Sequence, residues 1–403
     1  MTLDFEKLSP DLEQMALSLS ERYRQRRQRT ATFRRTLERF ADNWAAVQDA
    51  LAQSAARADK KFYRSARPLD DVEPLNAAIP PPEAPTQATL IAADGSQIMP
   101  DRHAAFLYYL INVGGIIYHH GEDDPPEVFS NPKISYLDEM HLDEEFGLSS
   151  SQISIERDLE EIGMLAEMVW AYREGVRPLL GLVDQRLLYW PIGGGGAASG
   201  RAVDTWCRRM TEIRQCGGLL AGYIDRPGKV SVVTLLQALG ADDKFDWKLL
   251  GKRESIQGMT DVYLFREILG PGQRSRVFLD VSPANERFAE VDPANQVCFF
   301  YLNPGHWGQQ IARVDIPLWV AQDREAVATV HALVIEQCQI TGDYPYALMR
   351  ADEMAVVGHR DREELDFMIE LTMQRHGVEG ELTAKQGSKE LARGGKTRHQ
   401  GIG

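Results

Sequence analysis

Two short apolar runs, each followed directly by an aspartate, constrain the fold of this chain more than any other feature. Residues 88–93 lead into Asp94 and a Gly-Ser turn, and residues 179–183 lead into Asp184. Apolar runs of this length are typical of buried strands. Because parallel strands of an α/β sheet gather their carboxyl ends at one crevice, we expect both aspartates on the same flank of one sheet. Such acids are suitable ligands for hard divalent cations.

The order of elements around these runs predicts the fold class. Strands are expected over 104–113 and 115–119, as antiparallel neighbours around Gly114, and a periodic helix is expected over 151–173. With the two runs above, the order is β-β-β-α-β, which ribonuclease H-like folds use. We therefore predict an α/β protein with a ribonuclease H-like mixed sheet flanked by helices and an N-terminal helical extension.

The rest of the chain divides into four predicted regions. Residues 1–64 form a helical region, 65–87 a Pro-rich linker or surface arm, 88–380 the main domain and 381–403 a disordered tail rich in Gly, Lys and Gln. Over 10–62, apolar residues recur at three- and four-residue intervals, as in one long helix or a helical hairpin. Later strands are expected at 218–224, 262–265, 277–279, 297–302 and 311–319, and helices at 324–340, 345–356 and 361–376.

Charge and cysteine content limit the function. The net charge of −14 argues against a protein that coats nucleic acid non-specifically, but not against an acidic site inside a basic groove. Between Arg22 and Arg35, seven arginines alternate with aromatic residues, which suits either a nucleic-acid or partner-binding face or a solvated helix. Four scattered cysteines argue against structural zinc and favour free thiols, mostly buried, in a reducing cytosol. Because no apolar window of about 18 residues exists, we expect no membrane contact and a cytoplasmic location.

A third acid is expected on the helix over 151–173. This helix runs antiparallel to the following strand, so its first half lies over the carboxyl end of the sheet. A strand of about 20 Å matches about 13 helical residues, which places Glu160 or Glu161 near the aspartates. Glu167, one to two turns deeper, remains an alternative. Phosphodiester hydrolysis by such acids uses two metal ions about 3.5–4 Å apart.

A fourth acid is expected on the helix that begins near Pro345. Proline suits the first helical turn, so Tyr344 lies at the mouth of the helix and Asp352 falls two turns along, on the side of Leu348. An acid on a core-facing stripe is costly unless it is paired or binds a metal. Asp352 is therefore a candidate ligand, and the alternative is a surface ion pair with Arg350 or Arg362.

Three basic residues are candidates for DNA contacts. Arg226 and Lys229 lie in a turn that either holds a DNA phosphate or is a plain surface turn. Arg313 alternates with apolar residues on a predicted strand, so it contacts either DNA or acidic partners.

Several pieces of the sequence resemble the NurA nuclease family over about residues 85–375. They include IAADGSQI, YLINVGG, AGYIDRP, FYLNPG, IARVDIPLWVA and YPYALMRADEMAV, in the order of the family motifs. The resemblance implies a ribonuclease H-like core, manganese-dependent nuclease activity on DNA ends and single strands, a homodimer, and partnership with a hexameric HerA-type translocase.

The resemblance also implies roles for individual residues. It makes Asp94 and Asp184 metal ligands, carries the family tyrosine to Tyr344, and puts the family glutamate at Glu161 or Glu167. The chain departs from the family pattern at Asp352, where a histidine is usual, and at Gln185, where a glycine is usual. Because aspartate is a harder ligand than histidine, Mg²⁺ is an alternative to Mn²⁺.

We therefore expect a divalent-metal-dependent DNA nuclease, acting as a 5′–3′ exonuclease and single-strand endonuclease in double-strand break end processing with a HerA-type translocase. Two ions, Mn²⁺ or alternatively Mg²⁺, would be held by Asp94, Glu161 or Glu167, Asp184 and Asp352, and Tyr344 would orient a phosphate or the attacking water. Two other functions are a catalytically inactive DNA-binding adaptor of the translocase, which the His-to-Asp departure favours, and a phosphoesterase for small molecules.

Overall fold

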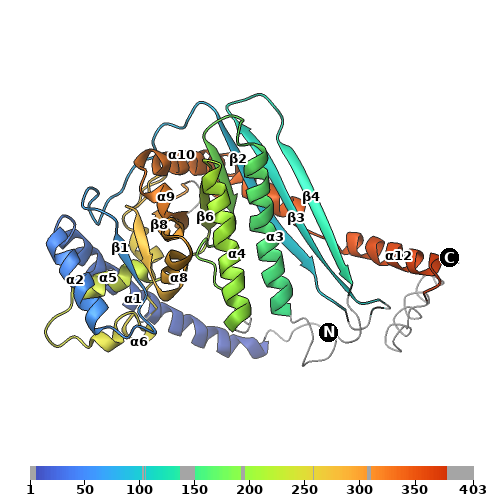
Figure 1. Ribbon diagram of the computed structural model, residues 1–403. Coiled ribbons are helices and arrows are strands. Elements are labelled where there is room, and N and C mark those ends of the chain that lie inside the picture. The colour runs from blue at the N-terminus through green and yellow to red at the C-terminus, as the bar shows by residue number, and fades with distance from the viewer. Residues whose placement is uncertain are drawn as a thin grey trace.

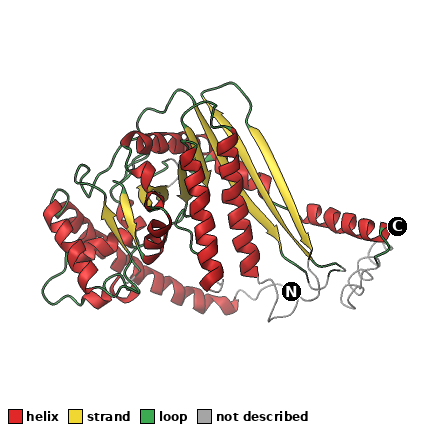
Figure 2. Cartoon of the chain, in the orientation of Figure 1, coloured by secondary structure: helices red, strands yellow, loops and turns green. Residues whose placement is uncertain are grey.

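A single mixed sheet of nine strands crosses the described part of the chain, with helices packed on both faces (Figures 1 and 2). The computed structural model describes residues 6–101, 104, 106–136, 150–191, 196–256, 258–305 and 310–378. The tail predicted over 381–403 lies outside these residues. The strands are β1 Ser65–Pro68, β2 Ala88–Ile98, β3 Tyr108–His120, β4 Glu127–Tyr136, β5 Leu179–Val183, β6 Leu219–Ile224, β7 Phe278–Val281, β8 Val297–Leu302 and β9 Ala312–Pro317.

The strand order across the sheet is β1-β7-β8-β9-β6-β5-β2-β3-β4. β2 is antiparallel to β3 and β3 to β4, whereas β5 is parallel to β2 and β6 is parallel to β5. Antiparallel strands β4, β3 and β2 followed by parallel strands β5 and β6 are the arrangement of ribonuclease H-like folds. The predicted fold class is therefore confirmed.

Helices cover both faces of the sheet, with α3 and α4 on one face and α10 and α11 on the other (Figure 1). Side chains alternate between the faces of a strand, so Leu90 and Ala92 of β2 pack with residues of α10 and α11, while Ile91 and Ala93 pack with residues of α3 and α4. The helices are α1 Ser9–Arg39, α2 Trp44–Arg57, α3 Ser150–Ala171, α4 Gly196–Gln215, α5 Ser231–Leu239, α6 Arg253–Ile256, α7 Asp261–Phe265, α8 Pro283–Val291, α9 Leu318–Ala321, α10 Arg324–Thr341, α11 Tyr346–Ala355 and α12 His359–Arg375, with single 3₁₀ turns at Glu6–Leu8, Trp247–Leu249 and Pro293–Asn295.

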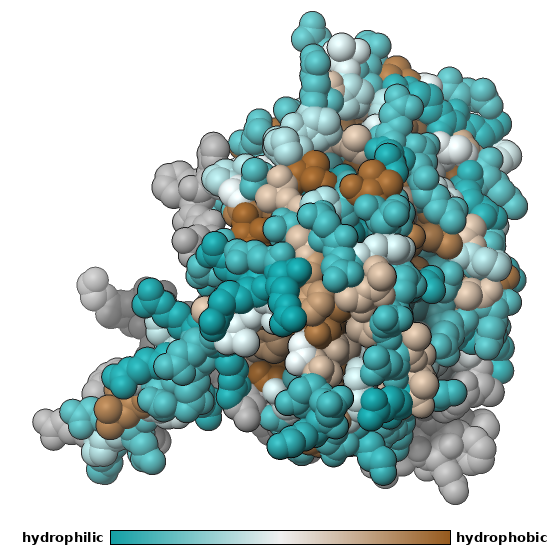
Figure 3. Space-filling view, turned by 90° about the vertical axis from the view of Figure 1, so that its left-hand side faces the viewer, coloured by the Kyte–Doolittle hydropathy of each residue, from teal (hydrophilic) through white to brown (hydrophobic). Residues whose placement is uncertain are grey.

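The N-terminal region is a helical hairpin rather than one long helix. Leu37 of α1 and Val47 of α2 are buried in a third core, together with apolar residues of α5. The end of the molecule that carries α2 presents a mostly hydrophilic surface (Figure 3). The Pro-rich segment that follows is attached to the domain, because β1 pairs with β7 at the edge of the sheet and Leu75 is buried. It therefore corresponds to the predicted arm and not to a free linker.

Three strand predictions need correction. The two strands expected around Gly114 are one continuous strand, β3, because Gly114 is a point of close helix approach and not a break. Residues 262–265 belong to the short helix α7, since a short apolar run fits a buried helix as well as a strand. β4 was not expected: nearly all of its residues are exposed, so it lacks the apolar alternation that signals a strand.

Two expectations about the bulk of the chain can be compared with the structure. All four cysteines are buried and unpaired, as predicted. None of the described helices is both long enough and apolar enough to cross a lipid bilayer.

Candidate active site

Asp94 and Asp184 lie side by side on the same face of the sheet. Ala93 of β2 pairs with Val183 of β5 in parallel register, so the two aspartates are the next residues of neighbouring strands. Leu90 and Leu182, at even positions like the aspartates, point toward α10 and α11. The structure therefore brings together the two acids with which the sequence argument began.

Tyr344 and Asp352 lie near the two aspartates. Asp352 belongs to α11, and Tyr344 lies two residues before the start of this helix. The hydroxyl group of Tyr344 lies close to the carboxylate of Asp184 and lowers its pKa, and the Tyr344 ring packs edge-on against Tyr223 of β6, with centroids 5.4 Å apart. The carboxyl group of Asp352 lies near that of Asp94 and helps to raise its pKa. Asp352 is exposed, not core-facing as expected, and Arg350 and Arg362 pair with other acids instead. The surface ion pair considered as the alternative is thus not found.

The C-terminal end of α11 is anchored directly on β2 and β3. Ser96 donates a hydrogen bond to the carbonyl oxygen of Ala355, and Asn112 Nδ2 donates to the same oxygen at 2.9 Å. A Cβ atom at Gly114 would lie 2.2 Å from Ala355 N, so only glycine permits this approach of helix to strand. These contacts explain how α11 holds Asp352 beside Asp94.

Glu161 reaches the aspartates from α3, on the opposite face of the sheet, where Gly95 has no side chain. A Cβ atom at Gly95 would lie 2.9 Å from Arg157 Cγ and 3.4 Å from Glu161 Oε2, so a larger residue there would displace the Arg157 side chain and contact this glutamate. Glu161 is only 3% exposed, and its Oε1 accepts a hydrogen bond from Gln185 Nε2 at 2.9 Å. Gln185, a departure from the family pattern, thus orients the glutamate.

The other two glutamates considered on α3 face away from the site. Glu160 pairs with Lys133 at 2.7 Å, and Glu167 is an exposed residue 4.0 Å from Arg209. Among the three candidates left open by the sequence, the structure places only Glu161 next to Asp94.

Burial and like charge raise the pKa of each acid in this cluster for which a shift is resolved. Asp184 keeps an exposed edge, but loss of solvent, followed by repulsion from Asp94, Asp225 and Asp352, raises its pKa to about 6 despite the opposing effect of the nearby Tyr344 hydroxyl group. Burial, followed by the charge of Asp94, raises the pKa of Glu161 well above its usual value. Burial and then Asp184 raise the pKa of Tyr344, so its hydroxyl stays protonated and can donate.

The donor set suits a hard divalent cation. Carboxylate oxygens are the ligands that Mg²⁺ and Mn²⁺ prefer, and an added cation would relieve the repulsion that raises these pKa values. Arg157 lowers the pKa of Asp94 and of Glu161, but its guanidinium group already pairs with Asp158 at 2.5 Å. Within the described ranges, no three acidic, His or Cys side chains are close enough to form a ready-made metal site. Ion binding therefore has to draw the carboxylates together.

Asp225 is a further acid at this edge that the sequence argument missed. It follows β6, the neighbour of β5, and its charge helps to raise the pKa of Asp184 and of Tyr344. The signal was present in the sequence, because an apolar run leads directly into Asp225 as it does into Asp94 and Asp184. Three adjacent parallel strands thus each bring an aspartate to this edge, Asp94 from within β2 and the other two from directly after β5 and β6.

The predicted DNA-binding residues lie in three different environments. Arg226 is highly exposed, 3.5 Å from Asp225, and is available to a phosphate. Lys229 is partly buried, and burial lowers its pKa.

The prediction for Arg313 is corrected, because this residue lies inside the protein. Its side chain is 1% exposed and pairs with Asp280 at 3.0 Å and Asp315 at 2.6 Å. Of the two roles expected for it, acidic partners are what the structure shows.

Comparisons with known proteins identify the family of this chain. A family model of the NurA domain matches residues 88–357, and no curated protein matches the sequence. Among solved structures, the NurA nuclease from Sulfolobus solfataricus is 14% identical, with 74% of this chain and 87% of that chain covered and a TM-score of 0.46. A NurA structure bound to dAMP and manganese is 12% identical, with 72% and 88% covered and a TM-score of 0.33. An endonuclease V from Ciona intestinalis, in complex with inosine-containing DNA, is 14% identical, with 70% and 87% covered and a TM-score of 0.33.

The family model decides the assignment. Its match to residues 88–357 spans most of the chain and contains Asp94, Glu161, Asp184, Tyr344 and Asp352. This protein therefore belongs to the NurA family.

Proposed function

We propose that this protein is a nuclease that cleaves DNA with the help of divalent metal ions. The observation that carries the proposal is the convergence of Asp94, Glu161 and Asp184, from three different elements, beside Tyr344 and Asp352. Membership of the NurA family supports it, because the Sulfolobus solfataricus member is described as a nuclease and two NurA structures contain manganese.

The carboxylates of Asp94, Glu161, Asp184 and Asp352 would hold the metal ions, Mn²⁺ or alternatively Mg²⁺, two per site. Bound there, the ions would supply Lewis-acid stabilisation of the phosphate and lower the pKa of water. The protein's own contribution is orientation: Gln185 holds Glu161 by a hydrogen bond, and the Tyr344 hydroxyl group lies beside Asp184. With its pKa raised, Tyr344 also remains a hydrogen-bond donor toward a phosphate oxygen.

The proposed substrates are DNA ends and single-stranded DNA, cleaved as a 5′–3′ exonuclease and a single-strand endonuclease in double-strand break end processing. The proposed assembly is a homodimer bound to a hexameric HerA-type translocase. Family membership supports both proposals. A chain with a net charge of −14 has little general attraction for DNA, which is consistent with a partner that supplies part of the affinity.

The neighbouring glutamates of α3 provide a matched test. Glu161→Gln should lower the rate of Mn²⁺-dependent cleavage of labelled single-stranded DNA by about 100-fold or more, because metal ions supply several kcal/mol of transition-state stabilisation. Glu167→Gln removes the same charge from the exposed side of the helix and should stay within about twofold of the unaltered protein, as surface changes usually do.

Calorimetric titration with Mn²⁺ gives a readout that does not depend on cleavage. We expect Glu161→Gln to weaken Mn²⁺ binding and Glu167→Gln to leave it unchanged. Equal cleavage and equal Mn²⁺ binding by both variants would contradict the proposed site.

A DNA-binding adaptor of the translocase without activity is the second candidate. The observation that favours it is Asp352, which stands in the place of the usual family histidine. If the unaltered protein binds DNA but leaves it intact with Mn²⁺ and with Mg²⁺, the adaptor is correct. Restoration of cleavage by Asp352→His would then identify the residue responsible.

A further inference from the structure

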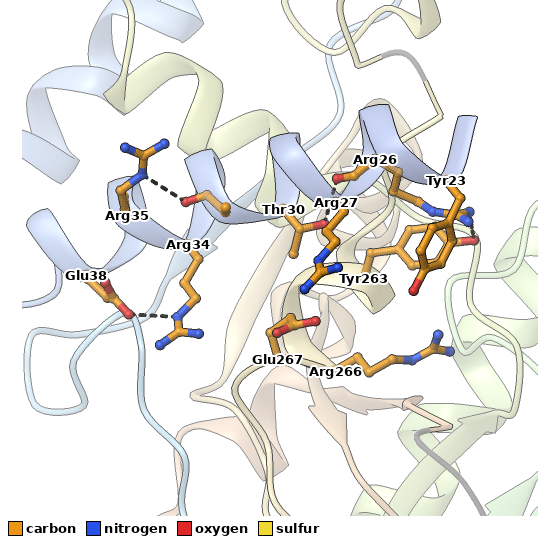
Figure 4. A pocket seen from close by; sticks show the side chains of 11 residues that line it. Tyr23, Arg26, Arg27, Thr30, Arg34, Arg35, Glu38, Tyr263, Arg266 and Glu267 are labelled. Carbon is orange, nitrogen blue, oxygen red and sulfur yellow. Dashed lines mark hydrogen bonds and ion pairs between the residues drawn. The ribbon is translucent and has the colours of Figure 1, made fainter. Parts of the chain in front are cut away.

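A basic groove lies between α1 and α7, outside the carboxylate cluster (Figure 4). Its volume is about 650 Å³, and five arginines and two glutamates line it. This local excess of positive charge contrasts with the net charge of −14 for the whole chain. The α1 wall lies before residue 88, where the match to the NurA domain begins. The family match therefore does not include the α1 wall of this groove, which carries four of the five arginines.

Several arginines of the groove can accept a new anionic partner. Arg27 is exposed and forms no ion pair with the residues that the structure describes, and Arg34 pairs only with the half-exposed Glu38, at 2.9 Å. Figure 4 shows Arg27, Arg34 and Arg266 extending to the same side of α1. Exposed pairs such as Arg34–Glu38 are worth little in water, so an incoming phosphate can replace the glutamate at low cost.

Aromatic rings lie among these arginines. The guanidinium group of Arg26 stacks 4.0 Å from the centre of the Tyr263 ring and donates a hydrogen bond to its hydroxyl oxygen, which holds Tyr263 in place. Tyr23 is 61% exposed at the same groove. A positively charged groove with an available aromatic face is the combination that binds single-stranded nucleic acid, because phosphates follow the charge and bases stack on the rings.

The groove continues toward the candidate active site. A second hollow of about 350 Å³ shares Tyr263 and Arg266 with it and is also lined by Arg226 and Asp225. Asp225 ends β6, beside the strand that carries Asp184. A strand lying along both hollows would therefore approach the carboxylate cluster.

We propose that this path, from Tyr23 and the arginines of α1 past Tyr263 and Arg266 to Asp225, binds single-stranded DNA and leads it to the carboxylates. The proposal rests on the nuclease function above, which it deepens by placing the substrate. A single strand fits better than a duplex, because only unpaired bases can stack on Tyr23. An acidic protein segment fits less well. Its carboxylate side chains would not stack on Tyr23, and the carboxylates at the end of the path would repel them.

Two pairs of arginines on the same helix give a matched test. Arg27→Ala/Arg34→Ala removes groove charges, whereas Arg22→Ala/Arg24→Ala removes two exposed charges outside the groove. The binding of a fluorescent oligothymidylate of about 30 nucleotides, long enough for several protein contacts, is measured in EDTA over a range of salt concentrations. The groove variant should bind about fivefold or more weakly, and its slope of log K against log salt should be smaller by about 1.4, the value for two phosphate contacts. The control variant should keep its affinity and slope, and equal slopes for the two variants would overturn the proposal.

Tyr23→Ala tests stacking separately from charge. It should weaken oligothymidylate binding by about fivefold or more while leaving the salt slope unchanged. Unaltered affinity would overturn the single-strand assignment. Competition by polyglutamate as effective as competition by unlabelled oligothymidylate would identify an acidic protein as the occupant, and would overturn it too.

DNA binding is measured without metal and cleavage with metal. The groove proposal and the nuclease proposal can therefore be contradicted independently of each other. Groove-dependent binding by a protein that never cleaves would overturn only the nuclease. If the protein cleaves DNA but the Arg27→Ala/Arg34→Ala variant binds DNA as tightly as the unaltered protein, only the groove proposal is overturned.

Discussion

Two groups of acids lie on the same sheet and differ in how their charge is balanced. Between β7 and β9, Arg313 pairs with Asp280 and Asp315, and its guanidinium group lies 3.8 Å from the centre of the Phe299 ring. The strand-end cluster consists of Asp94 in β2 and of Asp184 and Asp225, which directly follow the neighbouring strands β5 and β6, and the leading charges that act on Asp184 are those of other acids.

The contrast separates a structural charge cluster from a functional one. A buried charge is retained at low cost only when a partner satisfies it. In the Arg313 cluster, the arginine is the cationic partner of Asp280 and Asp315. No external cation is needed there, and the cluster joins β7 to β9 across the sheet. In the strand-end cluster, the described cationic side chains do not balance the carboxylates. An external cation or a phosphate–metal complex therefore binds there favourably.

The largest effect is expected from breaking the balanced cluster. Arg313→Met leaves Asp280 and Asp315 buried without their cation and should lower the free energy of unfolding by about 3–5 kcal/mol. Urea denaturation measures it. The control is Arg324→Met, whose exposed ion pair with Asp70 spans 3.7 Å and should cost less than about 1 kcal/mol. If both variants lost equal stability, the Arg313 cluster would not be the structural element described here.

A smaller effect of opposite sign is expected in the unbalanced cluster. Asp94→Asn removes one of the repelling charges, so without metal its free energy of unfolding should equal or exceed that of the unaltered protein. Mn²⁺ at about 100 times its dissociation constant should stabilise the unaltered protein by about 2.7 kcal/mol, and this gain should be largely lost in the variant. Thermal unfolding with and without Mn²⁺ measures both, and the same Mn²⁺ stabilisation in both proteins would place the ion elsewhere.

The smallest effect is the dependence of stability on pH. The native pKa of Asp184 is about 6, above its unfolded value near 4, so native protein binds the proton more tightly. Without metal, stability should therefore rise as the pH falls from about 7 toward 4, and the rise should be smaller in Asp184→Asn. Asp261, whose pKa burial also raises to about 6, contributes equally to both proteins and cancels in the difference. With Mn²⁺ bound the trend should reverse, because ions and protons compete for the carboxylate. An identical pH profile for the two proteins would show that Asp184 is not titrating in this range.

Local patterns were enough to find part of the site. Asp94 and Asp184 were predictable because an apolar strand followed by an acid is a contiguous signal, and parallel neighbours put such acids at one edge. The same signal marks Asp225. The choice of Glu161 over Glu160 and Glu167 was not available, because it depends on the rotation of α3 over the gap at Gly95, which packing sets.

Other features were ambiguous for similar reasons. The run Val262–Phe265 suits either a strand or a helix, and β4 carries too little apolar pattern to be seen. Whether Arg313 faces DNA or acids could be decided only once β7 was known to lie two strands from β9.

By itself, the sequence determined the mixed α/β class, the main helices and the strand-end aspartates, because each depends on periodicities within a few consecutive residues. Only the tertiary structure decided which glutamate joins them, which arginine is buried and how the helix rich in arginine meets α7 to form a groove. These depend on contacts between residues far apart in the chain, whose geometry is set by packing of whole elements against each other.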